Sequence, residues 1–258
     1  MQPFERLRYI ARHGADDRTL VVEAADCLAD FDGDPAGLVV TCRRLLHHHP
    51  DCGPLWWLCA RVLAAPAPSE AARAAKRLVL DDPTPTRLAG VLPFPHDEPV
   101  VVLGWPELVA SALASRPDLE VLAVQRTHGD ERLQLRVARS DTDTRVVDVA
   151  GAAAFEPSHV LVEVAAMSPS QALAETGTAD ALDLLARPAT LVWLVAGAGR
   201  TLPARLFDCV TRALEPDAMD LIDLQMADRI AGPTGLDRPE RIQMRVDCPV
   251  APELLRLG

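Results

Sequence analysis

Several features that would point to a function are missing from this sequence. Its 258 residues include a single tyrosine and 4% aromatic residues, carry a net charge of −11, and contain neither a GxxxxGK[ST] loop nor a GxSxG elbow. An acidic surface repels the phosphate backbone, so we expect no nucleic-acid partner. The two missing motifs remove the usual sequence evidence for a P-loop nucleotidase and for a serine hydrolase.

Long apolar runs and close cysteine pairs are missing as well. No stretch approaches ~20 uninterrupted apolar residues, and the N-terminal MQPFERLRYIARHG carries charges throughout, unlike a signal peptide. We therefore expect a soluble, cytoplasmic protein that does not bind membranes. The six cysteines form no CxxC pair in a chain long enough to bury a core. We expect reduced thiols, no cofactor and no metal site.

The first part of the chain has the periodicity of helices. Apolar residues recur three and four positions apart in two neighbouring segments, 38–46 and 55–63. Asp16 and Asp34 stand where an N-cap would begin a helix. Residues 1–90 are therefore expected to form a small helical N-terminal domain.

A proline-rich stretch from Asp82 to Pro99 interrupts this pattern and marks the crossing to a second domain at 91–258. There, near-continuous apolar runs alternate with helix-compatible segments, as in a parallel sheet buried on both faces. The expected strands are 100–103, 119–124, 145–149, 159–164 and 190–196. The expected helices are 106–115, 178–186 and 202–214. This order predicts an α/β fold with a doubly wound parallel sheet, in which ligands bind at the carboxyl ends of the strands.

The order of motifs in the second domain resembles one known family. The strand HVLVEV leads through AMSPSQALAE to Gly177 and Thr178, which open a helix before the strand LVWLVA. LEVLAVQR aligns Arg126 with the arginine that ends a further strand, and the resemblance covers 98–258. The sequence is thus similar to the translation initiation factor 2B regulatory subunits, the ribose-1,5-bisphosphate isomerases and the methylthioribose-1-phosphate isomerases, as a divergent bacterial member. The resemblance implies a helical N-terminal domain and a sheet of the ribose-5-phosphate isomerase and CoA-transferase-like type.

Three departures from the family pattern bear on activity. Ala165 stands where the isomerases of the family have an aspartate that acts as acid or base. Ala174 and Glu175 replace an Asn-Lys pair, so an anion stands in place of a cation of the phosphate site. Gly104 and Trp105 follow the first strand, where the enzymes have a cysteine. We therefore expect a non-catalytic regulatory or ligand-binding protein with a degenerate isomerase site.

Glu163 leaves a catalytic alternative open. It lies two residues before Ala165 on an apolar strand, so both side chains share a face, and a half-buried carboxylate there would have a raised pKa suited to acid-base work. The protein would then be an aldose-ketose isomerase of a phosphorylated sugar, or an enzyme of a related metabolite, with Glu163 as its catalytic residue. A structural ion pair with Arg126 or Arg200 is the other interpretation, and we favour it.

The AGAGR stretch after the last expected strand has two interpretations. It is either a tight turn or a loop whose amides and Arg200 hold an anionic ligand, and it departs from GxGxxG because Leu202 replaces the third glycine. Any ligand, such as a phosphorylated sugar or a nucleotide, is expected where strand ends and helix N-termini converge. The residues expected to bind it are Gly104, Arg126, Gly177, Thr178, Gly199 and Arg200, beside Glu163.

Three further features lie outside this expected site. The histidine run at 47–49 is interpreted as a solvated helix end rather than a metal site. The adjacent Trp56 and Trp57 project to different sides of a helix, so we expect one in the core and the other against the second domain or a partner. The segment 219–226 is more apolar than one sheet face requires, and with the pairing seen in the family it predicts a homodimer.

Overall fold

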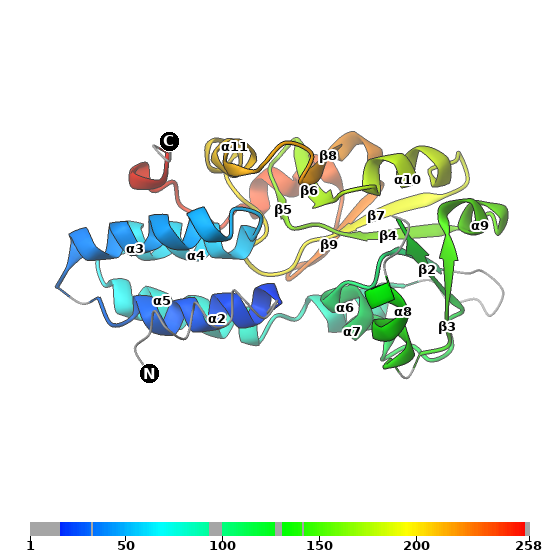
Figure 1. Ribbon diagram of the computed structural model, residues 1–258, viewed down its shortest axis with the longest axis horizontal. Coiled ribbons are helices and arrows are strands. Elements are labelled where there is room, and N and C mark those ends of the chain that lie inside the picture. Colours follow the sequence, from blue (N-terminus) through cyan, green and yellow to red (C-terminus); the bar gives the residue numbers. More distant parts are fainter. Residues whose placement is uncertain (1–15, 32, 93–99, 127–130, 141, 256–258) are drawn as a thin grey trace.

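The computed structural model describes residues 16–31, 33–92, 100–126, 131–140 and 142–255. The expectation about a signal peptide concerns residues 1–14, which lie outside the described residues, as do 93–99 of the proline-rich stretch. Helices form the first part of the described chain, and a sheet with covering helices follows (Figure 1). Among the described residues, no helix is both long and apolar enough to cross a membrane.

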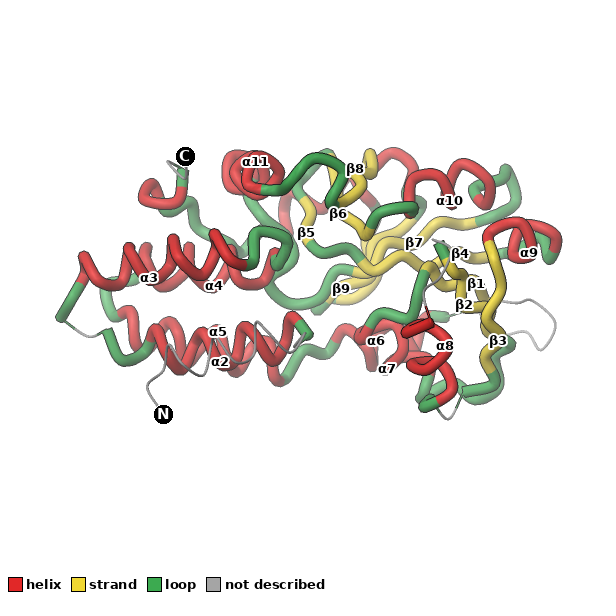
Figure 2. Tube along the Cα trace, viewed as in Figure 1, coloured by secondary structure: helices red, strands yellow, loops and turns green. Residues whose placement is uncertain are grey.

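Helices gather at one end of the molecule and the large sheet occupies the other (Figure 2). The helices of the first part are α2 (Asp17–Leu28), α3 (Pro35–His48), α4 (Gly53–Ala64), α5 (Pro68–Leu80) and α6 (Thr84–Val91). The two expected N-caps are confirmed, because Asp16 accepts a hydrogen bond from the amide of Thr19 at 2.7 Å and Asp34 accepts one from the amide of Gly37 at 2.9 Å. Each cap satisfies an amide that the first helical turn leaves unpaired.

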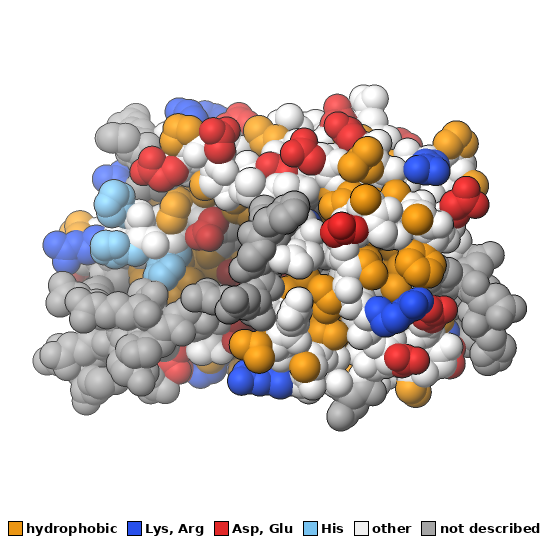
Figure 3. All heavy atoms as spheres, turned by 45° about the vertical axis from the view of Figure 1, so that its right-hand side comes forward, with side chains coloured by type: hydrophobic (Ala, Val, Ile, Leu, Met, Phe, Trp, Pro, Cys, Tyr) orange, Lys and Arg blue, Asp and Glu red, His pale blue; other side chains and the backbone are white. Residues whose placement is uncertain are grey.

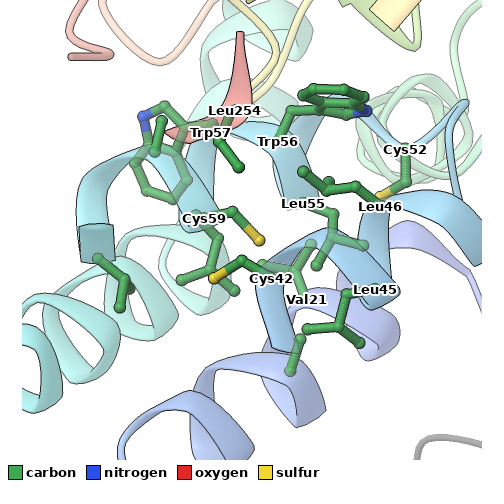
Figure 4. Packing of buried hydrophobic residues seen from close by; sticks show 14 of the residues in the cluster. Val21, Cys42, Leu45, Leu46, Cys52, Leu55, Trp56, Trp57, Cys59 and Leu254 are labelled. Carbon is green, nitrogen blue, oxygen red and sulfur yellow. The ribbon is translucent and has the colours of Figure 1, made fainter. Parts of the chain in front are cut away.

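Helix α4 lies in the centre of the helical core because its sequence is apolar on every side. Trp56 and Trp57 are both buried and point in different directions, and the sulfur atoms of Cys42 and Cys59 face each other (Figure 4). Phe207 of α11 (Ala204–Ala213) belongs to the same cluster of buried side chains. The helical core is therefore continuous with a helix from the second half of the chain.

The large sheet has the strand order β10-β9-β7-β4-β1-β2-β3. Its strands pair in parallel except for β10, which is antiparallel to β9. They are β1 (Val100–Leu103), β2 (Val121–Gln125), β3 (Thr144–Asp148), β4 (His159–Glu163), β7 (Leu191–Val195), β9 (Arg229–Gly232) and β10 (Gly235–Asp237). All five expected strands are present, and the expectation of an α/β fold with a parallel sheet is confirmed.

Helices cover both faces of this sheet, which explains the continuous apolar runs. Val101 and Leu103 of β1 contribute to a core with α9 (Val149–Ala154) and α10 (Thr178–Leu185). Val100 and Val102 contribute to a second core on the opposite face. Its helices are α6, α7 (Glu107–Leu113) and α8 (Glu131–Ala138). Successive strand residues point to opposite faces, so a strand covered on both sides is apolar at every position.

Two parts of the sheet architecture differ from expectation. Strand β3 is partly exposed rather than buried on both faces, because it is the edge of the seven-stranded sheet. A second, antiparallel sheet of order β5-β6-β8 is also present and was not expected. It consists of β5 (Ala166–Met167), β6 (Gln171–Glu175) and β8 (Met219–Asp223), and 3₁₀ turns follow at Leu224–Met226, Pro239–Arg245 and Pro252–Leu254.

Candidate functional site

A cleft of about 210 Å³ opens at the carboxyl end of β4, between the sheet and the start of α2. Its lining carries six carboxylates but two guanidinium groups. The lining residues are Asp16, Asp17, Asp51, Pro106, Glu107, Arg136, Glu163, Ala165, Glu175, Arg200 and Met219. The cleft therefore contains Ala165 and Glu175, two of the positions at which the sequence departs from the family pattern, and its charge opposes an anionic ligand.

Glu163 is held at the floor of this cleft by three groups. Its Oε1 lies 3.1 Å from Nη2 of Arg200, and the two side chains are 5% and 11% exposed. Its Oε2 accepts hydrogen bonds from the amides of Leu108 at 2.9 Å and Val109 at 3.3 Å, in the first turn of α7. The structural ion pair between Glu163 and Arg200 is thus present, and both carboxylate oxygens have partners.

Arg200 also has partners besides Glu163. Its Nη1 donates to the carbonyl oxygen of Val164 at 2.6 Å, and its Nη2 lies 3.4 Å from Oδ2 of Asp17. Although burial lowers the pKa of Arg200, the carboxylates of Glu163 and Asp17 raise it above its ordinary value. Arg200 therefore keeps its charge and links β4, the AGAGR turn and helix α2.

Burial raises the pKa of Glu163 above its ordinary value. The charge of Arg200 and the amides of Val109 and Leu108 oppose this shift without cancelling it. The pKa of Glu107 on the cleft wall is also raised, first by burial and then by Asp16. Desolvation is therefore the main influence on the pKa of Glu163 and on that of Glu107.

A second ion pair, between Arg126 and Glu175, lies close to Gly104. The φ angle of Gly104 is +76°, and a Cβ at this position would lie 3.1 Å from Nη2 of Arg126. The glycine therefore allows both the left-handed backbone and the close approach of the guanidinium. The remaining guanidinium of the cleft, that of Arg136, donates to the carbonyl oxygen of Trp105.

The N-terminus of α10 holds the Gly-Thr pair of the family motif. Gly177 is the N-cap with φ +85°, and the buried hydroxyl of Thr178 donates to the carbonyl oxygen of Glu175. The next amide, that of Ala179, donates to Oδ2 of Asp220 at 2.8 Å. A carboxylate from β8 therefore occupies a helix N-terminus at which an anionic ligand was expected.

The AGAGR stretch forms a tight turn that contacts the helical segment. The amide of Ala198 donates to Oδ2 of Asp82 at 2.8 Å. Gly199 has φ +78°, and a Cβ there would lie 2.9 Å from Cε3 of Trp57. Gly199 therefore lines a larger cavity beside Trp57, whereas Arg200 lines the acidic cleft.

The histidine run ends α3 at the surface. His47 and His48 are exposed, and Figure 3 shows imidazole side chains at the surface of the molecule. In the part of the chain that the structure describes, no group of three or more histidine, cysteine, aspartate or glutamate side chains is arranged so that it could hold a metal ion. The exposed position at a helix C-terminus is the one expected for a solvated helix end.

No protein-family model matches the sequence, and no curated protein matches it either. Solved structures do match. The tetrameric eIF2B-beta2-delta2 complex of Chaetomium thermophilum contains a chain that matches with 14% identity over 93% of this chain and 92% of that chain, at a TM-score of 0.76. Translation initiation factor eIF-2B of Pyrococcus horikoshii OT3 matches with 13% identity over 93% and 98%, at a TM-score of 0.73.

An enzyme shares the fold as well. The 5-methylthioribose 1-phosphate isomerase of Pyrococcus horikoshii OT3 is 13% identical over 93% of this chain and 86% of that chain, at a TM-score of 0.62. Identities this low establish the fold and leave the activity open. The protein has the fold of the eIF2B and methylthioribose-1-phosphate isomerase family, which confirms the resemblance predicted from the order of its sequence motifs.

Proposed function

We propose that the protein is an initiation factor 2B-like regulatory or small-ligand-binding protein without isomerase activity, in which the family's isomerase site has become part of the structural framework. One observation carries this proposal: internal carboxylates occupy the backbone amides that would otherwise be available to a phosphorylated substrate. Asp220 accepts a hydrogen bond from a backbone amide at the N-terminus of α10, and Glu163 accepts hydrogen bonds from two amides at the N-terminus of α7.

Two arginines of the cleft and the neighbouring Arg126 support the same proposal. Arg126 pairs with Glu175, Arg136 donates to a backbone carbonyl, and Arg200 is paired with Glu163. A phosphate group would have to displace a carboxylate to reach Arg126 or Arg200, and the displaced carboxylate would remain nearby as a like charge. The cleft is therefore unfavourable to the dianionic ends of sugar phosphates.

A proton carrier suited to isomerisation is also missing at the expected position. Ala165 presents a methyl group to the cleft, where the family isomerases have an aspartate. Proton transfer by a positioned side chain contributes about 10²- to 10⁴-fold to a rate, and a methyl group contributes none. The remaining carboxylate on the same strand, Glu163, would have to leave its ion pair and two amides to act as a base.

A second candidate function rests on the raised pKa of Glu163. A buried carboxyl with a raised pKa is the type of group that enzymes use as a general acid. Under this alternative, Glu163 would shuttle a proton between the carbons of an aldose phosphate or a related metabolite. The cleft would then belong to an aldose-ketose isomerase whose acid has moved two residues along β4.

Ligand titrations distinguish an acidic framework from a phosphate site. Isothermal titration of 5-methylthioribose 1-phosphate or ribose 1,5-bisphosphate is expected to show no saturable binding below about 1 mM. The variant Glu175→Lys returns a cation to the family position and releases Arg126, so it is expected to bind at least about tenfold tighter than the native protein.

The matched control is Glu215→Lys, which makes the same charge change at an exposed position of the loop after α11. We expect it to bind like the native protein. Equal gains in both variants would show a general charge effect, and tight binding to the native protein would contradict the proposal.

Self-association is proposed through strand β8, an edge of the three-stranded sheet. Leu221 on this strand is 49% exposed and Met226 just after it is 36% exposed. The tetramer among the fold relatives is consistent with association of this fold. An edge strand with an exposed leucine favours pairing with a second copy, and we propose a homodimer.

Light scattering at micromolar concentration is expected to give about twice the chain mass of 27.8 kDa. The variant Leu221→Lys is expected to shift the mass toward that of the monomer, because a charge at a paired edge must be desolvated. Leu184→Lys changes a side chain that is 56% exposed on α10 and should leave the mass unchanged. A monomeric native protein would rule out the dimer.

The cysteines support a cytoplasmic location as part of this proposal. All six are free and buried. Burial raises the pKa of the Cys27 thiol to about 11 and that of Cys248 to about 12, so both are protonated and unreactive near neutral pH. Six unpaired thiols fit a reducing compartment.

A further inference from the structure

We propose that the larger cavity, on the other side of the AGAGR turn from the acidic cleft, binds a compact and mainly apolar small molecule whose polar end is neutral or basic. Its volume is about 490 Å³, within the range of about 300–1,000 Å³ that is common for small-molecule sites. The inference holds for both the regulatory and the catalytic function, because it concerns neither Glu163 nor Ala165.

The cavity lies where the helical segment meets the sheet. One wall is the end of α5 and the start of α6, with Ala74, Leu78 and Pro83. The other wall is the β9–β10 hairpin and the 3₁₀ turn after it. That wall contributes Ile230, Gly232, Pro233, Thr234, Gly235, Asp237 and Ile242. The lining is mostly apolar, so an apolar ligand would gain free energy by leaving water.

Hydrogen bonds hold together the segments that line the cavity. Oδ2 of Asp82 accepts a hydrogen bond from the amide of Ala198, and Oδ1 accepts one from the amide of Thr84 at 2.9 Å. The indole N–H of Trp57 donates to Asp247 at 3.1 Å. These bonds join helices α4 and α6 to the β7 turn and to the C-terminal segment. A preformed site loses less entropy on binding, so fewer contacts suffice for affinity.

Two glycines that line the cavity pack closely against neighbouring segments. A Cβ at Gly197 would lie 2.5 Å from Oδ2 of Asp82, and one at Gly232 would lie 3.0 Å from the carbonyl oxygen of Ala196. At both positions the backbone packs too closely against its neighbours to leave room for a side chain. Glycine therefore allows the turn after β7 to lie close to Asp82 and to β9, which form adjacent parts of the site.

The charges at the rim select the polar end of the ligand. Among the described residues, the charged groups that line the cavity are Asp81, Asp237, Asp247 and the guanidinium of Arg77. Asp247 is also paired with Arg61 at 3.3 Å. The lining groups together carry a net negative charge, which favours a basic or neutral group on the ligand and opposes a phosphate or carboxylate. This selectivity separates the cavity from the anion sites of the family.

Three indole compounds with the same ring test this inference by ligand-observed NMR or calorimetry. Tryptamine is basic, tryptophol is neutral and indole-3-acetate is anionic. Tryptamine and tryptophol are expected to bind the native protein, and indole-3-acetate to bind about tenfold more weakly than tryptamine. Failure of both tryptamine and tryptophol to bind would overturn the proposal.

Two variants locate the binding. Ala74→Phe fills the cavity from α5 and is expected to abolish binding of all three compounds, whereas Ala213→Phe on the exposed side of α11 should leave binding unchanged. If Ala74→Phe does not fold, the variant Asp81→Asn tests whether the compounds bind in this cavity. This variant is expected to weaken the binding of tryptamine about threefold and to leave the binding of tryptophol unchanged. Equal binding of tryptamine to native protein and to both cavity variants would place the site elsewhere.

Discussion

Replacing Arg200 by methionine is expected to lower the free energy of unfolding by about 3–5 kcal/mol at neutral pH. The change leaves Glu163 buried, with its side chain 5% exposed, and removes its counter-charge. It also removes the donor to the carbonyl oxygen of Val164. An uncompensated buried carboxylate and an unpaired carbonyl both destabilise the folded state. Urea denaturation followed by circular dichroism measures the loss.

The pH dependence of this loss identifies its cause. Burial raises the pKa of Glu163, and Arg200 opposes that shift, so the pKa rises further in Arg200→Met. A carboxyl with a raised folded-state pKa stabilises the fold below its unfolded pKa, and this contribution is lost as the pH rises through the folded value. The difference in the free energy of unfolding between the native protein and Arg200→Met should therefore become smaller when the pH falls from about 8 to about 5.

The matched control is Arg205→Met on the exposed side of α11. It is expected to change stability by less than about 0.5 kcal/mol at either pH, as surface substitutions usually do. If Arg200→Met unfolded at the same urea concentration as the native protein at neutral pH, the ion pair would not have the structural role described above.

Gly199→Ala is expected to cost about 3 kcal/mol, from a left-handed backbone and a steric clash. The φ angle at this position is +78°, and the new Cβ would lie 2.9 Å from Cε3 of Trp57 and 3.2 Å from Cα of Pro54. Because Trp57 is buried and Pro54 contributes backbone, neither can move away freely. Chemical denaturation of the variant measures the cost.

Gly33→Ala separates the two contributions. Gly33 has φ +84°, and nothing lies within 4 Å of the position of its Cβ. This variant should lose about 1 kcal/mol from backbone strain alone. Equal losses in the two variants would show that the contact between the AGAGR turn and helix α4 contributes little to stability.

Much of the fold was predictable because its signals are local. The apolar run at 100–103 became β1, and the Asp16 and Asp34 caps lie where the helix signals placed them. The antiparallel sheet was not predictable in this way. Strand β6 pairs with β8, and Leu173 lies opposite Leu221. Short strands that are distant in sequence carry no periodic signal that would reveal their pairing.

The residues of the candidate site that lie on one strand or in one motif were predictable from the sequence. Glu163 and Ala165 share a strand end, and the family resemblance marked Glu175. The carboxylates of Asp220 and Asp82, which occupy backbone amides in distant turns, were missed. Asp82 precedes Pro83-Thr84, and this helix-capping signal could have indicated its bond to Thr84. Its bond to Ala198 depends on tertiary packing, which sequence spacing does not reveal.

Turnover of 5-methylthioribose 1-phosphate and ribose 1,5-bisphosphate by the purified protein tests the loss of isomerase chemistry most directly. Loss of one positioned acid or base costs about 10²- to 10⁴-fold, and the missing cysteine and Asn-Lys pair remove further contributions, so turnover is expected to remain within the background of the assay. Robust turnover that disappears in Glu163→Gln would contradict this expectation and make Glu163 the catalytic residue. Turnover that persists in that variant would contradict both proposed functions of the cleft.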